Sequence, residues 1–225
     1  ERRRAGEPLQ YVLGRWSFRG LDLLVDRRVL IPRPETEVVA GAAVVAARTV
    51  GGGRPKVVDL GTGSGAIGLA VAAEVPGARV WATDVSPEAL AVARANVAGS
   101  GSAVGTRVRL LEGDWWGALP EELRGRIDVV VSNPPYVAGE ERLPPEVEGW
   151  EPQIALRAGR TGREALEVVV GGAPAWLARP GVLVVELAPH QAEPMADFAR
   201  RVGFAAVQVV DDLAGRRRVL VARTP

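Results

Sequence analysis

The sequence predicts an α/β domain with a doubly wound, seven-stranded, mostly parallel sheet in which one strand is antiparallel. From Val57 onward, short apolar runs rich in β-branched residues alternate with helix-length segments, the pattern of repeated strand–helix units. A glycine-rich turn, residues 61–65, follows the first of these runs directly. Near the carboxyl end, residues 211–215 join two predicted strands, and this link is too short for a helical crossover.

The first stretch of the chain precedes these units and is predicted to form a small β-hairpin. Tyr11–Leu13 and Trp16–Val25 alternate apolar and polar residues around Gly14 and Gly20. An extended link is expected at Ile31–Pro34, because a proline favours extended backbone in the residue before it.

A helix is predicted directly after this link. Thr36 is expected to be its N-cap, with Glu35 and Glu37 in the first turn, where the helix dipole favours carboxylates. The helix is expected to run to about Arg48, and the glycines at 51–53 end it.

The remaining elements are predicted from buried runs, caps and breakers. Strands are expected at residues 57–60, 79–83, 107–111, 127–131, 182–187, 204–210 and 217–222. Helices are expected at residues 66–74, 86–97, 162–177 and 191–202. Residues 137–160 are rich in charge and proline and indicate an irregular active-site flap.

A rigid loop, Asn133-Pro134-Pro135-Tyr136, is predicted after the fourth strand, because its prolines allow neither a strand nor a helix to continue. Ligands of open α/β sheets bind at this end of the strands. The amide oxygen of Asn133 and the carbonyl of Pro134 are two acceptors for an NH2 group, and Tyr136 offers a flat face to a planar group. The loop therefore fits the orientation of a weakly nucleophilic amide or aromatic amine. A plain proline-rich turn is the alternative.

A nucleoside site is predicted beside this loop. Glycines after the first strand let a ligand approach backbone N–H groups, and the carboxylate that ends the second strand can accept hydrogen bonds from both ribose hydroxyls. The alternative is a bare glycine-rich turn. The residues predicted here are Asp59, Gly61, Thr62, Gly63, Ser64, Gly65 and Asp84.

Two nucleoside cofactors compete for this site. The glycine spacing in residues 61–66 formally satisfies the dinucleotide pattern of NAD. However, Asp59 can approach a cationic amino-acid group, and no acid–base histidine lies near a plausible hydride site. S-adenosylmethionine, which supplies a ribose, a charged amino acid and an electrophilic methyl group, fits better. Asp114 and Trp115 would flank its adenine, or Trp115 is an ordinary rim or core aromatic.

The composition argues against several other classes of protein. With 28 Lys and Arg against 27 Asp and Glu, the net charge of +1 argues against a nucleic-acid backbone as the main partner. The absence of cysteine excludes disulfides and thiolate sites and fits a reducing compartment. A single histidine, His190, argues against a histidine metal site, and we expect it at a helix start or on the surface. We expect a cytoplasmic monomer that binds no metal, membrane or nucleic acid, with the arginines at 2–4 and 216–218 in solvent.

Several motifs occur in an order that resembles the release-factor glutamine methyltransferases. They are Ile-Pro-Arg-Pro-Glu-Thr-Glu (31–37), Asp-Leu-Gly-Thr-Gly-Ser-Gly (59–65), Gly-Asp-Trp (113–115), Ser-Asn-Pro-Pro-Tyr (132–136), Glu-Pro-Gln-Ile-Ala-Leu (151–156) and Asp-Leu-Ala-Gly-Arg (212–216). The likeness extends from about Gly6 to Arg223. It implies a class I S-adenosylmethionine-dependent methyltransferase fold. It also implies methylation of the glutamine side-chain amide in the Gly-Gly-Gln loop of peptide chain release factors.

The resemblance also implies a division of the chain and of its residues. Family members carry a helical domain before the catalytic one, so residues 1–34 are expected to be a remnant of it or a link from it, and residues 35–225 to be the catalytic domain. The residues implied as catalytic are Asn133, Pro134, Pro135 and Tyr136, with Asn133 also at the cofactor. Those implied at the substrate are the same four with Arg33 and Glu35, although these two could also belong to an ordinary surface loop.

Three alternatives stay open at this point. Residues 157–162 depart from the acidic, glycine-rich run usual in the family, so a paralogue with another protein target is possible. Asn-Pro-Pro-Tyr is shared with methyltransferases that act on the adenine amine of DNA or RNA. A non-catalytic nucleoside-binding protein is the third alternative.

Overall fold

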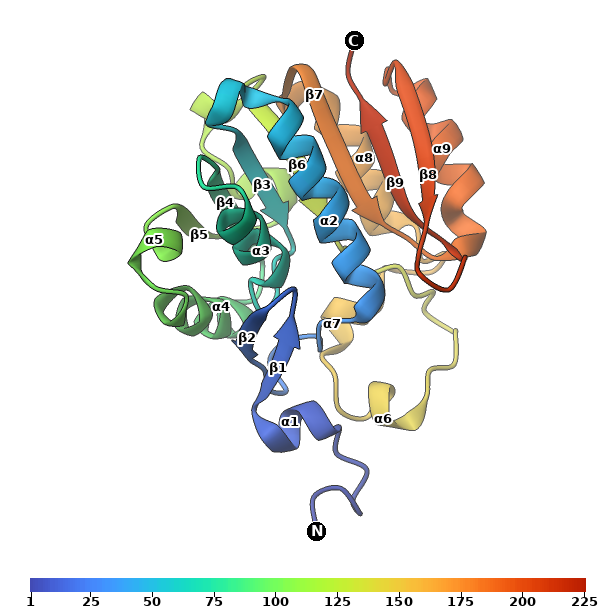
Figure 1. The fold of residues 1–225 in the computed structure, drawn as a ribbon. Coiled ribbons are helices and arrows are strands. Elements are labelled where there is room, and N and C mark those ends of the chain that lie inside the picture. The colour runs from blue at the N-terminus through green and yellow to red at the C-terminus, as the bar shows by residue number, and fades with distance from the viewer.

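The computed structural model describes residues 1–225, with Gly51 described by its backbone alone. Its centre is a sheet of seven strands. These are β3 (Lys56–Leu60), β4 (Arg79–Asp84), β5 (Val108–Glu112), β6 (Ile127–Ser132), β7 (Leu177–Glu186), β8 (Ala206–Asp211) and β9 (Arg217–Arg223). Their order is β5-β4-β3-β6-β7-β9-β8, and β9 is antiparallel to both of its neighbours. The predicted sheet, mostly parallel with one antiparallel strand, is confirmed (Figure 1).

Helices cover both faces of this sheet (Figure 1). The longer ones are α2 (Pro34–Thr49), α3 (Ala66–Glu74), α4 (Pro87–Gly99), α8 (Glu164–Trp176) and α9 (Ala192–Arg201). The short ones are α1 (Leu9–Leu13), α5 (Ser102–Gly105), α6 (Pro145–Glu148) and α7 (Gln153–Leu156). Turns of 3-10 helix are η1 (Gly51–Gly53), η2 (Trp115–Ala118), η3 (Glu121–Leu123) and η4 (Pro189–Gln191). None of the described helices has the length and apolar character needed to cross a lipid bilayer.

Side chains of the central strand β6 alternate between two apolar layers. Val129 and Val131 join a cluster with α2 and α3, whereas Val130 joins one with α8 and α9. All three valines are fully buried, and burying each such side chain contributes about 1.5–3 kcal/mol. A strand buried on both faces therefore requires the continuous β-branched run that this sequence has.

The amino-terminal hairpin forms a separate small sheet, β1 (Arg15–Phe18) with β2 (Leu21–Leu24). The expectation that Tyr11–Leu13 belongs to it is wrong, because these residues are helical and form the end of α1. Gly14 ends that helix in a left-handed conformation with φ of 70°. The helical turn buries Tyr11, whose hydroxyl donates to the carbonyl oxygen of Val29 at 2.6 Å.

The expected N-cap of α2 is also wrong. The helix begins at Pro34, with Arg33 as N-cap and no side-chain capping bond. Thr36 therefore lies inside the first turn, where its hydroxyl donates to Glu186 Oε2 at 2.7 Å. The Thr36 hydroxyl therefore bonds the buried carboxylate of Glu186 instead of a backbone group at the start of the helix.

Other departures are smaller. Strand β7 begins at Leu177 rather than at Val182, because Ile127 pairs with Leu177 before the register shifts. Residues 137–160 are not wholly irregular, since they contain α6 and α7. Of the arginines expected in solvent, Arg218 is buried and donates to a backbone carbonyl at 3.2 Å.

The sheet order places a crevice at the carboxyl ends of β3 and β6. Strands β4 and β5 continue the sheet on one side of β3, and β6 and β7 continue it on the other. Loops that leave β3 and β6 therefore diverge, and such a switch point is where open α/β sheets bind ligands. In Figure 1 the hairpin and α7 lie beside this end of the sheet.

Candidate active site

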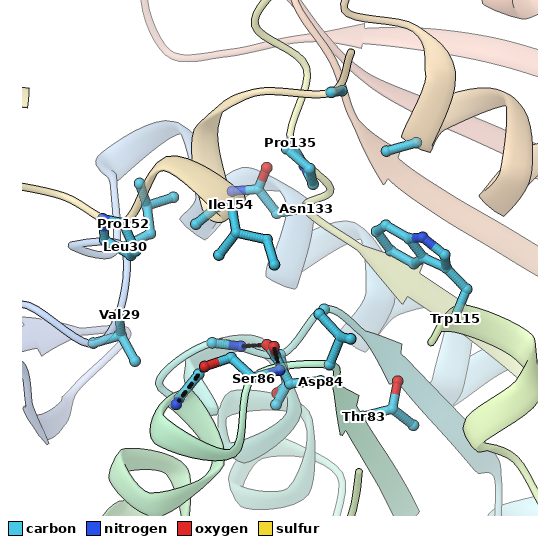
Figure 2. A pocket seen from close by; sticks show the side chains of 18 of the residues that line it. Val29, Leu30, Thr83, Asp84, Ser86, Trp115, Asn133, Pro135, Pro152 and Ile154 are labelled. Atoms are coloured by element: carbon cyan, nitrogen blue, oxygen red, sulfur yellow. Dashed lines mark hydrogen bonds between the residues drawn. The ribbon is translucent and has the colours of Figure 1, made fainter. Parts of the chain in front are cut away.

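A cavity of about 570 Å³ lies at the carboxyl ends of the parallel strands. Figure 2 shows Asn133 and Pro135 on one side of it, Asp84 and Ser86 on the opposite side, and Trp115 at one end. Most of the residues predicted for the cofactor meet here. Those that line the cavity are Gly61, Thr62, Gly63, Ser64, Asp84, Asp114, Trp115 and Asn133.

Asp84 is held at the cavity wall by two backbone donors. Its Oδ2 accepts from Gly63 N at 2.8 Å, and its Oδ1 accepts from Ser86 N at 2.9 Å. Burial raises the pKa of Asp84, and these backbone bonds oppose that rise. Each carboxylate oxygen retains capacity for a further hydrogen bond, so Asp84 can accept from ligand hydroxyls.

Asp59 occupies a different place from the one expected. It is fully buried behind the glycine-rich loop and does not line the cavity. Its Oδ2 accepts from Thr62 Oγ1 at 2.6 Å and from Gly68 N at 2.9 Å. Burial raises the pKa of Asp59 to about 6. The expected direct approach to a cationic ligand group does not fit this geometry, and Asp59 instead shapes the loop from behind.

Gly65, the last loop glycine, also lies off the cavity wall. It is the N-cap of α3 and adopts φ of 84°, a left-handed conformation that favours glycine. Gly61 meets a second constraint besides its φ of 70°. A Cβ atom on Gly61 would lie 3.6 Å from the ring of Trp115, so this indole packs against the loop. Trp115 itself has φ of 42°, while Asp114 before it is exposed at the rim.

The Asn133–Tyr136 loop separates the large cavity from a smaller one of about 190 Å³. Pro135 lines the large cavity, whereas Pro134 and Tyr136 line the small one. Asn133 lines both. Leu30 and Ala155 also line both, so Asn133 is the polar side chain at the junction among the residues described.

Hydrogen bonds from this loop reach Glu186, a carboxylate that lines the small cavity and is not among the predicted site residues. Asn133 Nδ2 donates to Thr36 Oγ1 at 3.2 Å, and the Tyr136 hydroxyl donates to Glu186 Oε1 at 3.2 Å. Glu186 is fully buried at the end of β7, and burial raises its pKa to about 7. In the sequence, the signal for Glu186 is that it is the single carboxylate within the apolar run of residues 182–187.

Arg33 and Glu35, the two residues predicted at the substrate mouth, both line the small cavity. Arg33 forms an ion pair with Glu151, a buried residue whose Oε2 also accepts from Ile31 N at 3.1 Å. Arg33 and Glu151 belong to motifs 118 positions apart, and neither motif by itself predicts this contact. Glu151 therefore ties the link before α2 to the segment before α7.

The flap that follows is organised by Arg157. Its guanidinium donates to the backbone carbonyls of Ala138, Gly139 and Glu141 and forms an ion pair with Glu148 at 2.6 Å. These bonds satisfy carbonyls that an irregular segment would otherwise leave unpaired. The segment thus has a defined course over the site.

Gln191 binds the carboxyl end of the Asn133–Tyr136 loop. Its Nε2 donates to the carbonyls of Tyr136 at 3.0 Å and Gly162 at 2.9 Å. His190, its neighbour, is exposed and lines neither cavity. Among the described residues there is no cluster of three or more His, Cys, Asp or Glu side chains arranged to hold a metal ion.

Comparison with known proteins agrees with this arrangement. A family model described as the methyltransferase small domain matches residues 38–146. The chain is 41% identical over 225 residues to the release factor glutamine methyltransferase of Cereibacter sphaeroides, covering 99% of this chain and 77% of that protein. It is 43% identical over 225 residues to the protein of the same name from Gloeobacter violaceus, covering 98% and 76%.

A solved structure shares the fold as well. The release factor-specific protein-(glutamine-N5) methyltransferase from Alicyclobacillus acidocaldarius superposes with a TM-score of 0.52 at 25% identity. The superposition covers 86% of this chain and 94% of that one.

Proposed function

We infer, because this chain belongs to the release factor glutamine methyltransferase family, that it transfers a methyl group from S-adenosylmethionine to the side-chain amide nitrogen of a release factor glutamine. The observation that carries this inference is the position of Asn133 between two cavities. The large cavity has the size of a small-molecule site, and the small one opens beside Asn133 for a single side chain.

The residues of the large cavity fit S-adenosylmethionine. Asp84 has the free acceptor capacity for ribose hydroxyls, the loop at residues 61–64 exposes backbone to the ligand, and Trp115 offers an aromatic wall. Asp59 contributes negative charge from behind the loop, and its Oδ1 has no hydrogen-bond partner among the residues that the structure describes. The cofactor supplies an electrophilic methyl group when bound.

The chain's own part in the reaction is to hold a poor nucleophile. An amide nitrogen reacts weakly because its lone pair is delocalised into the carbonyl group. Asn133 Oδ1 and the Pro134 carbonyl would accept hydrogen bonds from its two N–H groups and favour the positive charge that develops as the nitrogen attacks. Loss of one of these N–H protons to solvent then leaves the neutral methylated amide. Pro134 and Pro135 fix these acceptors relative to each other. Tyr136 limits the plane in which the amide can lie, and Arg33 and Glu35 border the path by which the glutamine enters.

The division into residues 1–34 and 35–225 stays a prediction. We propose that both parts build one catalytic unit, because Val29 and Leu30 of the first part line the large cavity. The Gly-Gly-Gln loop as target, a monomeric state, a cytoplasmic location and the absence of nucleic-acid binding also stay predictions.

The test is methylation of a defined protein. The chain is incubated with a peptide chain release factor and isotope-labelled S-adenosylmethionine, and tryptic peptides are analysed by mass spectrometry. We expect one added methyl group on the glutamine of the Gly-Gly-Gln loop. Transfer to DNA or RNA in a parallel reaction, with none to the release factor, would contradict the inference.

A further inference from the structure

Three side chains from distant parts of the chain form a continuous hydrogen-bonded line along the walls of the two cavities. Thr36 Oγ1 donates to Glu186 Oε2 at 2.7 Å, and Asn133 Nδ2 donates to Thr36 Oγ1 at 3.2 Å. Thr36 and Glu186 are buried, and Asn133 is half-buried with its side chain between the two cavities. The line runs from the end of β7 through the first turn of α2 to the loop after β6.

The direction of these bonds follows from the protons available. An ionised carboxylate can only accept, so the single hydroxyl proton of Thr36 must point to Glu186. The Thr36 oxygen is then left with lone pairs toward Asn133, and these lone pairs suit the NH2 group but repel the amide oxygen. An amide can otherwise occupy either of two orientations that differ by an exchange of its oxygen and nitrogen.

We propose that Glu186 is a positioning residue that acts through Thr36 to keep the amide oxygen of Asn133 directed at the substrate nitrogen. The proposal rests on the proposed function, since it concerns the same transfer. Glu186 borders the small cavity, but in this scheme its carboxylate bonds Thr36 and Tyr136 and not the substrate nitrogen. Its effect is to select one of two orientations of the Asn133 side chain.

The charge of Glu186 is essential to this scheme, because a protonated carboxyl could donate to Thr36 and release the hydroxyl proton toward Asn133. The groups that face Glu186 are Tyr136 from the Asn133–Tyr136 loop, Arg218 from β9, and Thr36 and Glu35 from α2. Burial raises the pKa of Glu186 to about 7, whereas Arg218 and the hydrogen bonds from Thr36 and Tyr136 oppose the rise. The rate of methyl transfer should therefore increase as the pH rises through neutrality.

Glu186→Gln is the direct test, because it keeps the shape but adds an NH2 donor beside Thr36. We expect kcat for release factor methylation to fall by about 10- to 100-fold, as for other small misorientations of a reacting group. Cofactor affinity, measured by calorimetry, should change less than twofold. The increase in kcat between pH 6 and pH 8 should disappear. Glu193→Gln, which changes an exposed carboxylate on α9, should leave all three measurements unchanged.

Variants of Thr36 separate orientation from folding. Thr36→Ser keeps the hydroxyl and should retain kcat within about threefold, whereas Thr36→Val should lower kcat to the level of Glu186→Gln. Because both changes remove the same orienting contact, Glu186→Gln combined with Thr36→Val should cost little more than either alone. Circular dichroism of each variant checks that the fold is retained.

The possible outcomes are distinct. If the parent enzyme is active and Glu186→Gln has the same kcat and the same pH dependence, this inference alone is overturned. Additive losses in the double variant would also overturn it, because they would mean that the two residues act separately. A parent enzyme that does not methylate release factor would overturn the proposed function and this inference with it.

Discussion

Asn133 can assist an amide nucleophile in only one of its two side-chain orientations. Its oxygen must face the substrate, because the NH2 group is a donor and would oppose the hydrogens of the target nitrogen. The contact from Asn133 Nδ2 to Thr36 corresponds to that orientation. The neighbouring prolines fix the backbone on which this side chain is carried.

Replacement of Asn133 by alanine should therefore affect chemistry more than binding. We expect Asn133→Ala to lower kcat by about 10²-fold or more, the usual loss for one oriented polar group, with little change in cofactor affinity. Single-turnover methylation and calorimetry measure the two quantities. A parallel loss of affinity and rate would instead mean that Asn133 acts mainly by binding the cofactor.

Asp84 should show the opposite pattern. Asp84→Ala removes a carboxylate that faces the cavity and accepts from Gly63 N and Ser86 N, so the cofactor would lose a partner and the loop a constraint. We expect cofactor affinity to fall by about tenfold or more, in line with the loss of hydrogen bonds to a charged group. Asp197→Ala, at an exposed position on α9, is the matched control. Unchanged affinity in Asp84→Ala would refute the role assigned to Asp84.

At the scale of elements, the site depends on contacts between segments that have little regular structure. The link before α2 and the segment before α7 meet at Glu151, which bonds both Ile31 N and Arg33. The flap is in turn bonded through Arg157. These contacts give the small cavity a wall that neither segment could form alone.

Glu151→Ala should loosen this wall. The change leaves the Ile31 amide unpaired and the Arg33 guanidinium without its partner. We expect the free energy of unfolding to fall by about 1–3 kcal/mol, because Arg33 remains partly exposed to solvent. Urea denaturation measures the loss, and limited proteolysis should show faster cleavage within residues 137–160. The control is Glu146→Ala in the same flap, because the Glu146 side chain makes no bond that the structure describes. Equal stability of the two variants would contradict the assignment.

At the scale of the whole molecule, buried carboxyls give stability a definite pH dependence. Burial raises the pKa of Asp59 from 3.8 to about 6 and that of Glu186 from 4.5 to about 7. The folded state therefore holds these protons more tightly than the unfolded state does. Their contribution to stability is complete below about pH 4 and is lost as the pH rises through 7.

In Glu186→Gln, the free energy of unfolding should fall less steeply as the pH rises than it does in the parent. The interval from 4.5 to about 7 corresponds to about 3 kcal/mol at most, so the variant should be at least as stable as the parent at pH 8. The difference should shrink toward pH 4.5. Carboxyls whose pKa is lowered by partners, such as Glu74 and Asp212, act in the opposite sense, but at lower pH. Denaturant unfolding at pH 5 and pH 8 checks this, and a variant less stable than the parent at pH 8 would contradict it.

Much of this molecule could be predicted from local sequence. The run Val129–Val131 has to belong to a strand buried on both faces, because three consecutive β-branched apolar residues leave no polar face to turn to water. The glycine-rich turn, the carboxylate at the end of the next strand and the paired prolines also follow from the conformational limits of single residues. The sheet with one antiparallel strand follows from the short connection before β9.

Tertiary structure alone decided how the site is supported. Thr36 looked like a helix cap, and Glu186 looked like one polar residue in a core strand, yet they form a hydrogen bond across 150 positions of sequence. Asp59 was expected in contact with the ligand but is enclosed behind its loop. A side chain's partners depend on which elements pack together, and the packing of α2 against the end of β7 is not encoded in either segment separately.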